Sequence, residues 1–144
     1  MSEHPEQVRI RIEVSRGGFV KRRPDGSVDF ASPLPSPFSY GSVEGRMAAD
    51  GDPEDALVVG SSPRRGEVVT LGVYGRVLFV DAGVEDHKWI CAERPPSAVD
   101  IRRVERFFAW YAKAKRLLYW SRRVEGGAQF HGVENFELQC VRTD

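Results

Sequence analysis

An acidic stretch at residues 50–55 constrains this chain more than any other feature of its sequence. It places Asp50, Asp52, Glu54 and Asp55 within six positions, with a glycine and a proline between them. Glycine and proline make the backbone turn here, so the stretch cannot continue a helix or a strand ladder. Carboxylates this close together repel one another unless water or a cation neutralises them, and a hard divalent cation does so best. The stretch therefore predicts a tight acidic loop suited to a metal ion.

This loop has two other interpretations. A solvated turn is the ordinary one, because Asp, Gly and Pro are common turn residues. A calcium-binding EF-hand loop is excluded, because Asp55 stands where that loop needs glycine and Ser61 where it needs a bidentate glutamate. The apolar run at residues 56–59 predicts a core strand that begins directly after Asp55. A core strand would hold Asp55 in place, which favours a fixed site over a plain turn.

Length and charge indicate one domain without a dominant electrostatic field. The 144 residues are enough for a single core, and the 21 basic and 21 acidic residues cancel. We therefore expect no nucleic-acid partner and no membrane partner. Residues 1–7 are predicted to be a flexible tail, and residues 8–144 a single domain. Charge is nevertheless segregated, with basic residues at 9–23, 64–65, 102–106 and 113–123 and acidic ones at 50–55 and 81–86.

Cysteine usage and hydropathy indicate the cellular compartment. Two cysteines, Cys91 and Cys140, do not make a disulfide framework, and we expect both thiols to be reduced. The polar N-terminus lacks the apolar core of a signal peptide, and no run reaches membrane-spanning length. A cytoplasmic location is expected.

Short strands separated by glycine and proline predict a small barrel in a mainly β (α+β) chain. Strict alternation from Val8 to Val14 predicts a half-buried first strand. A hairpin is predicted over residues 19–30, and three prolines then predict an extended loop over residues 31–41. The remaining candidates are strands at 56–59, 68–74, 76–80 and 88–92 and a second acidic loop at 81–86.

One long helix is predicted over about residues 98–118. Ser97 and Asp100 have the spacing of a capping box. Apolar residues then recur at three- and four-residue spacing, at Ile101, Val104, Phe108 and Tyr111. We expect the aromatic residues of this segment to lie in the core: Phe107, Phe108, Trp110 and Tyr111. The chain after the helix is predicted to form a short strand and loop.

At this point the acidic loop and its surroundings resemble a known family. Residues 50–58 closely resemble the Asp-Gly-Asp-Pro-x-Asp-x-Leu-Val signature of the family I soluble inorganic pyrophosphatases. The resemblance covers about residues 8–127. Further matches follow in the family's order: Lys21, Tyr40-Gly41, Asp81 with Glu85-Asp86-x-Lys88, Phe107-Phe108-x-x-Tyr111 and Arg123-Val124-Glu125-Gly126.

The resemblance implies an OB-like five-stranded barrel with one long C-terminal helix packed outside. It also implies Mg²⁺-dependent hydrolysis of inorganic pyrophosphate, or a related phosphoanhydride, by a homo-oligomer. Bridging magnesium ions and ammonium donors would stabilise the charge that develops on the leaving oxygen.

The resemblance also assigns expected roles to individual residues. Asp50, Asp55 and Asp86 would bind a first magnesium ion, and Asp55 would share a second. Asp81 and Asp86 would hold the metal that arrives with the substrate. Asp52 would be the base that deprotonates the attacking water. The substrate-binding positions would be Lys21, Lys88, Tyr111 and Tyr40, and Glu13 would match a further metal-site glutamate.

Several family positions are replaced in this chain. Arg23 stands where the family has an acid, Phe30 where it has an arginine, and Ser36 where it has a tyrosine. Ala82 replaces an acid, Ala112 replaces a lysine, and Glu54 replaces an apolar residue. Cations at Arg22, Arg23, Arg46 or Lys113 would be candidates to restore phosphate contacts. Three interpretations stay open: an active but altered pyrophosphatase, a degenerate relative that binds metal and phosphate or hydrolyses another phosphoanhydride, and a barrel used for protein contacts.

Overall fold

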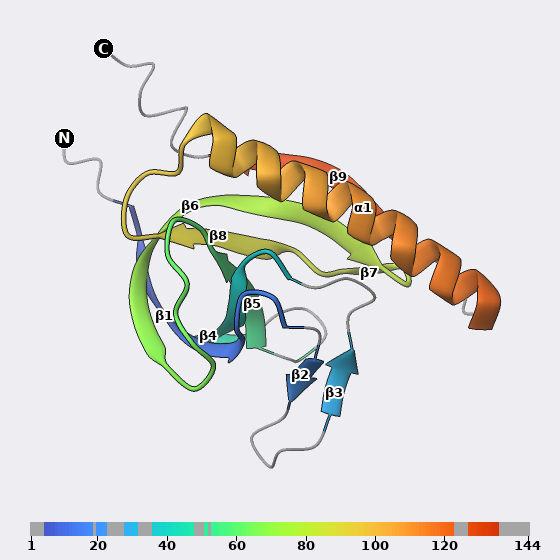
Figure 1. The fold of residues 1–144 in the computed structure, drawn as a ribbon, viewed down its shortest axis with the longest axis horizontal. Helices are drawn as coiled ribbons and strands as arrows, with labels where there is room; N and C mark the ends of the chain where they lie inside the picture. The colour runs from blue at the N-terminus through green and yellow to red at the C-terminus, as the bar shows by residue number, and fades with distance from the viewer. Residues whose placement is uncertain are drawn as a thin grey trace.

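Five strands close on themselves into a barrel (Figure 1). The computed structural model describes residues 5–18, 20–22, 28–31, 36–47, 51, 53–122 and 127–135. The barrel strands follow the order β1-β4-β5-β8-β6, and pairing of β6 with β1 completes the ring. The β5–β8 pairing is parallel and the others are antiparallel. The bounds are β1 (Gln7–Val14), β4 (Ser39–Met47), β5 (Pro53–Val58), β6 (Val68–Asp81) and β8 (Lys88–Ala92).

This arrangement confirms the expected OB-like barrel. Numbered along the chain, the five barrel strands are joined in the order 1-2-3-5-4-1, a Greek-key path. The predicted first strand is present, and its apolar residues alternate inward as the sequence indicates. The predicted hairpin is present as β2 (Val20–Arg22) paired with β3 (Val28–Ala31), whereas its turn lies outside the described residues. The prediction that residues 50–55 cannot continue a strand ladder is wrong from Pro53 onward, because β5 begins there and Asp55 pairs with Ser42 of β4.

Two hydrophobic clusters lie on the two faces of the barrel wall. All five barrel strands contribute to the inner cluster, which includes Ile10, Val43 and Cys91. The outer cluster joins the barrel wall to the helix and includes Leu57, Phe79 and Phe108. Because side chains alternate along a strand, neighbouring residues enter different clusters. This alternation decides which charged residues face the helix.

The predicted loop over residues 31–41 is wrong at its end, because β4 begins at Ser39. Pro37 lacks an N–H, but the backbone two residues later is free to pair. Gly41 then lies so close to β1 that an added Cβ would stand 2.0 Å from the carbonyl oxygen of Arg11. Glycine is therefore required at this position within the strand.

Two predicted strands, at residues 68–74 and 76–80, form the single strand β6. A register shift between Val73 and Gly75 in the pairing with β8 absorbs the irregularity, so the strand bends without ending. The predicted second acidic loop is a hairpin, because β7 (Val84–Glu85) folds back on β6. Ala82 and Gly83 both have positive φ, 51° and 81°, as a two-residue hairpin turn requires.

The helix α1 (Ala98–Arg122) lies along the outside of the barrel, next to β9 (Ala128–Asn135) (Figure 1). Its capping box is confirmed: the Ser97 hydroxyl accepts from Asp100 N, and the Asp100 carboxylate accepts from Ser97 N, both at 3.1 Å. The helix ends at Arg122 rather than near residue 118. No helix within the described ranges is long and apolar enough to cross a membrane.

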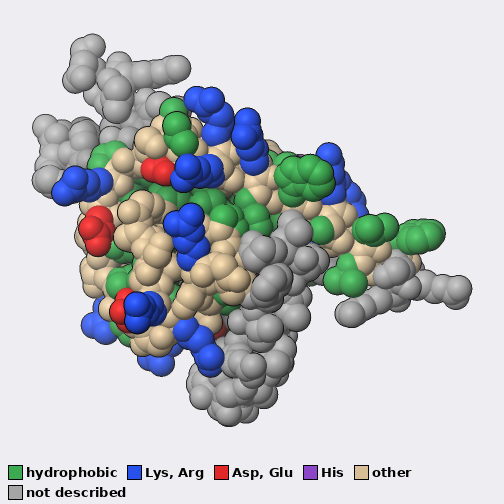
Figure 2. Space-filling view, in the orientation of Figure 1, with side chains coloured by type: hydrophobic (Ala, Val, Ile, Leu, Met, Phe, Trp, Pro, Cys, Tyr) green, Lys and Arg blue, Asp and Glu red, His purple; other side chains and the backbone are tan. Residues whose placement is uncertain are grey.

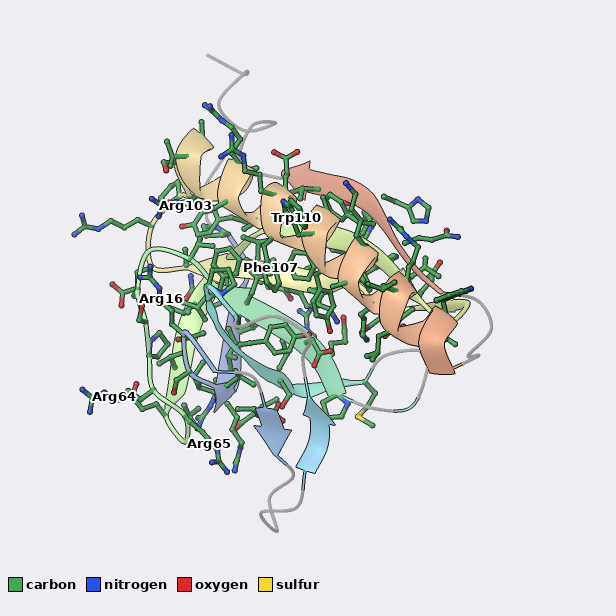
Figure 3. The ribbon with its side chains drawn as sticks, turned by 45° about the vertical axis from the view of Figure 1, so that its right-hand side comes forward. Arg16, Arg64, Arg65, Arg103, Phe107 and Trp110 are labelled. Atoms are coloured by element: carbon green, nitrogen blue, oxygen red, sulfur yellow. The ribbon has the colours of Figure 1, made fainter. Side chains whose placement is uncertain are left out.

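The aromatic prediction for this helix is correct except at Trp110. Phe108 and Tyr111 are buried, and Phe107 is partly buried between α1 and the barrel, where Figure 3 shows it. Trp110 is instead 65% exposed. A step of one residue turns a helix by about 100°, so a run of aromatic residues cannot face one side. Trp110, Leu117 and Trp120 are exposed hydrophobic residues of α1. Figure 2 shows hydrophobic side chains on the protein surface along this helix.

Candidate active site

A buried lysine lies between two of the predicted aspartates. Asp55 on β5 is the register partner of Lys88 on β8, and Lys88 Nζ lies 3.4 Å from Asp55 Oδ2. The same ammonium lies 2.8 Å from Asp86 Oδ2. The Lys88 side chain is only 6% exposed, so its charge is neutralised by these carboxylates rather than by water. Alternation along the two strands places Asp55 and Lys88 on the same wall face as Leu57 and the helix.

Tyr40 completes this cluster from β4. Its hydroxyl is hydrogen-bonded with the Asp55 carboxylate, and Lys88 Nζ lies 5.6 Å from the centre of its ring. Desolvation raises the pKa of Tyr40 well above its usual value, and the negative charges of Asp55 and Asp86 raise it further. The phenol is therefore a neutral hydrogen-bond donor throughout the physiological pH range.

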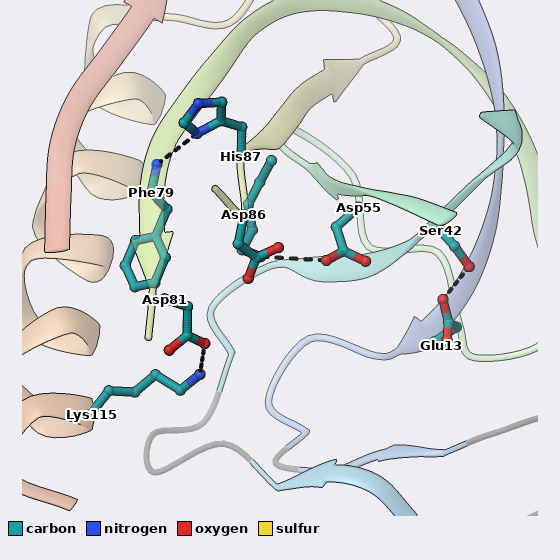
Figure 4. Close-up of polar contacts among 9 residues, drawn as sticks. Glu13, Ser42, Asp55, Phe79, Asp81, Asp86, His87 and Lys115 are labelled. Carbon is teal, nitrogen blue, oxygen red and sulfur yellow. Dashed lines mark hydrogen bonds and ion pairs between the residues drawn. The ribbon is translucent and has the colours of Figure 1, made fainter. Parts of the chain in front are cut away.

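A second buried ion pair joins the helix to the end of β6. Lys115 Nζ lies 2.5 Å from Asp81 Oδ2, and the two side chains are 5% and 19% exposed (Figure 4). Lys115 Nζ also lies 5.3 Å from the centre of the Tyr111 ring, which stacks on Phe107. Sequence reasoning missed Lys115. The available signal was its position four residues after Tyr111, on the same helix face.

Glu13 approaches the same region from β1. Its carboxylate accepts a hydrogen bond from the Ser42 hydroxyl, and Ser42 is the register partner of Asp55 (Figure 4). Figure 4 also shows the carboxylates of Asp55 and Asp86 facing each other. Three strands and the segment before β8 therefore present carboxylates to one region.

Some predicted site residues cannot be placed. Asp50 and Asp52 lie outside the described residues, as does Arg23. Lys21 belongs to β2, but its side chain is not among those described. The residues that the structure does bring together are Tyr40, Asp55, Asp86, Lys88 and Tyr111, with Asp81 joined to Tyr111 through Lys115.

The described donor set suits a hard divalent cation only in part. It consists of carboxylate oxygens, which such cations prefer. Within the described ranges, however, no three acidic, histidine or cysteine side chains gather closely enough to hold a metal ion. The acidic loop that would add Asp50 and Asp52 is outside those ranges. The chemistry of Asp55 and Asp86 therefore fits a metal, with further ligands needed.

Two of the replaced positions, Ser36 and Ala112, and the neighbouring histidine have local structural roles. The Ser36 hydroxyl donates to the carbonyl of Phe38 and accepts from its N–H, so it forms a local turn. Ala112 is buried in the outer cluster. His87, the residue after Asp86, accepts at Nδ1 a hydrogen bond from Phe79 N at 3.0 Å. This hydrogen bond stabilises the segment that connects β6 to β8.

Two of the four cations proposed to restore phosphate contacts, Arg46 and Lys113, do not join the carboxylates of the site. Arg23 and the side chain of Arg22 lie outside the described residues. Arg46 is paired with Glu6 and lies 5.8 Å from the ring of Trp89. Lys113 is exposed, with its Nζ 5.5 Å from the ring of Trp110. The exposed Arg64 and Arg65 project from the loop before β6 (Figure 3). The described cations of the site are therefore Lys88 and Lys115.

Fold and site together define an OB-like barrel protein with a carboxylate and lysine cluster under an outer helix. A sequence model of the family described as "Inorganic pyrophosphatase" matches residues 1–131. The chain therefore belongs to the inorganic pyrophosphatase family, and the resemblance noted in its sequence is confirmed.

Individual relatives agree with this assignment. The chain is 34% identical to an inorganic pyrophosphatase of Gluconobacter oxydans over 60% of its length, and 35% identical to that of Halalkalibacterium halodurans over 62%. The matched regions span 55% and 60% of those relatives. The crystal structure of inorganic pyrophosphatase from Thermus thermophilus is similar with a TM-score of 0.73 and 25% identity, covering 96% of this chain and 87% of that one.

Proposed function

We propose that this chain hydrolyses inorganic pyrophosphate to two phosphates by means of a metal-activated water. The observation that carries the proposal is the shared ammonium of Lys88 between Asp55 and Asp86, in a chain of the inorganic pyrophosphatase family.

The proposed cofactor is Mg²⁺, held by Asp50, Asp55 and Asp86, with Asp55 shared by a second ion. Asp81 and Asp86 would receive the metal that accompanies the substrate. Bound Mg²⁺ would neutralise phosphate charge and lower the pKa of a water molecule. Oxygen donors at Asp55 and Asp86 support this assignment.

The chain's own residues would bind the substrate and move the proton. Asp52 would accept a proton from the attacking water. Lys21 and Lys88 would bind phosphate oxygens by charge, whereas Tyr40 and Tyr111 would donate neutral hydrogen bonds. The raised pKa of Tyr40 supports this role, because a phenolate beside a phosphate would repel it.

A phosphoanhydride-binding protein without pyrophosphatase turnover is the second candidate. The local role of the Ser36 hydroxyl and the apolar Ala112 are the observations that raise it, since both stand where the family resemblance places substrate clamps. Family membership and the named relatives favour hydrolysis over it. Such a protein would keep metal and phosphate affinity but would not accelerate hydrolysis.

A homo-oligomer is proposed as the assembled form, in the cytoplasm. Three large apolar residues on one face of α1 support self-association, because exposed apolar patches mark interaction surfaces. They are Trp110, Leu117 and Trp120, with exposed fractions of 65%, 68% and 78%. The balanced charge of the chain continues to argue against a nucleic-acid or membrane partner.

The deciding experiment is phosphate release from pyrophosphate with Mg²⁺, compared between the wild-type chain and Asp52→Asn. We expect turnover that falls by at least about 100-fold in the variant, because a positioned base contributes that much. Glu93→Gln, at an exposed carboxylate after β8, is the matched control and should keep full activity. Absence of turnover in the wild-type chain, with retained binding of Mn²⁺ and imidodiphosphate, would favour the second candidate.

A further inference from the structure

Lys115 is a buried cation whose position the family resemblance does not explain. The residue is only 4% exposed, although it lies about two turns before the end of a helix whose other lysine, Lys113, is exposed. A lysine withdrawn from water keeps its charge only when an anion is close to it. Asp81, at 2.5 Å, supplies that anion in the structure.

The surroundings of Lys115 connect it to the proposed substrate site. Its ammonium lies 5.3 Å from the ring of Tyr111, one helical turn earlier on the same face. Tyr111 in turn contributes to the electrostatic environment of Tyr40, which is hydrogen-bonded with Asp55. Ala112, between Tyr111 and Lys115 in sequence, is buried and has no polar group to offer. Among the described side chains of α1, Lys115 is thus the cation directed toward the carboxylates.

We propose that Lys115 is a substrate-binding residue that exchanges partners: it holds Asp81 in the free protein and transfers to a phosphate oxygen when a metal takes that carboxylate. The inference rests on the proposed function. It names a residue for phosphate binding at a position that is one turn away from the replaced lysine position, Ala112.

Charge balance drives this exchange. A divalent cation bound to Asp81 would repel the Lys115 ammonium that is now paired with this carboxylate. The repulsion is strong in a poorly hydrated site. The lysine side chain is long and has rotatable bonds, so its ammonium can move without displacing the helix. A phosphate oxygen entering with the metal offers the anion that the displaced ammonium needs.

The exchange predicts opposite effects of Lys115 on two affinities. Removing its charge frees Asp81 for a metal, so metal binding to the substrate-free protein is unchanged or tighter. The same change removes a charge-assisted hydrogen bond to the phosphate, so affinity for the substrate falls. A lysine with a purely structural role would weaken both affinities together.

The test uses the full chain with Lys115→Gln, Lys115→Arg and the exposed control Lys113→Gln. Mn²⁺ binding is followed by electron paramagnetic resonance, and imidodiphosphate binding with Mg²⁺ by calorimetry. Lys115→Gln should weaken imidodiphosphate binding by about 10- to 100-fold and leave Mn²⁺ binding equal or tighter. Lys115→Arg should retain part of the imidodiphosphate affinity, and Lys113→Gln should match the wild type.

The proposal is overturned if Lys115→Gln binds imidodiphosphate as the wild type does, or if both affinities fall in parallel. It is also overturned if the wild-type chain does not bind imidodiphosphate. If circular dichroism shows that Lys115→Gln does not fold, Lys115→Met replaces it as the uncharged variant. The two affinities are then compared between Lys115→Met and the charged Lys115→Arg. A wild-type chain that binds imidodiphosphate without releasing phosphate from pyrophosphate would overturn the hydrolytic function alone, because the Lys115 comparison depends only on binding.

Discussion

Asp55 and Lys88 lie opposite each other in the parallel pairing of β5 with β8, with 3.4 Å between Asp55 Oδ2 and Lys88 Nζ. The strand register therefore places these two residues next to each other, whichever rotamers their side chains adopt. The ammonium also serves Asp86, so one cation balances two carboxylates. The charge state of the candidate site is thus coupled to the integrity of the barrel wall.

Replacing Lys88 by methionine should destabilise the metal-free protein by about 3 kcal/mol, because two partly buried carboxylates lose their counterion. Urea unfolding in the presence of a chelator measures this loss. Mg²⁺ should reduce the difference, since a cation can replace the missing charge. Lys113→Met is the exposed control and should change stability by less than about 0.5 kcal/mol. Equal stability of Lys88→Met and the wild type would contradict the buried arrangement.

Replacing Tyr40 by phenylalanine should remove a late step of tyrosine ionisation, well above pH 10, in an alkaline absorbance titration. The folded protein keeps this phenol neutral, whereas the unfolded chain ionises it near pH 10. Its contribution to stability is therefore complete below pH 10 and is lost as the pH rises toward the raised pKa of the folded state. An unchanged titration curve in Tyr40→Phe would contradict the assignment.

Cys91 should react slowly with thiol reagents in the folded protein and rapidly in urea. Burial raises the pKa of its thiol from 9.0 to about 12, against a smaller lowering by Arg46. The neutral thiol favours folding below pH 9, and this advantage is lost between pH 9 and about 12, by at most about 1.4 kcal/mol per pH unit. The stability of Cys91→Ala should fall less steeply over that window than that of the wild type. Equal slopes would show that the thiol does not contribute.

Replacing Gly41 by alanine should cost about 3 kcal/mol, because the added Cβ would overlap the carbonyl oxygen of Arg11 and push β4 away from β1. Urea midpoints measure the effect. Gly66→Asn is a useful control, since Gly66 has φ of 93°, open space around it and a replacement that tolerates this conformation. A smaller loss at Gly41 than at Gly66 would contradict the close strand approach.

Replacing Trp120 by glutamate should lower the oligomeric state measured by sedimentation, because a charge would enter the exposed apolar face of α1. Trp120 is 78% exposed, so the folded protomer should tolerate the change. Val68→Glu, at an exposed apolar residue of the barrel, should leave the assembly intact. Identical assembly of Trp120→Glu and the wild type would place the contact elsewhere.

The sequence predicts well those elements whose residues carry a local pattern. Alternation from Val8 to Val14 identifies β1, and the reciprocal spacing of Ser97 and Asp100 identifies the start of α1. The start of β4 is missed because the prolines before it predict a loop that continues to residue 41, although Gly41 is the residue that the close approach of β1 requires. That requirement is a tertiary contact, which single-sequence patterns do not contain.

The candidate site is predictable for the same reason and to the same extent. The family-like motifs identify Asp55, Asp86 and Lys88, which the structure brings into contact. Lys115 is not predictable, because a charged residue in a basic helix normally faces water and only packing shows that this one is buried. The exposed Trp110 is the converse error: its aromatic ring suggests burial, whereas the helical phase places it outside.

The long strand β6 has a consequence for how the protein folds. It pairs with β1 at one end and carries Asp81 at the other, where β7 and β9 also join it. Pairing β6 with β1 brings together segments that are far apart in the sequence. The chain therefore loses conformational entropy before the contacts between these two strands stabilise it. The Asp81 and Lys115 pair should consequently assemble after the folding barrier. Cations that bind there would then lengthen the lifetime of the native state without accelerating its formation.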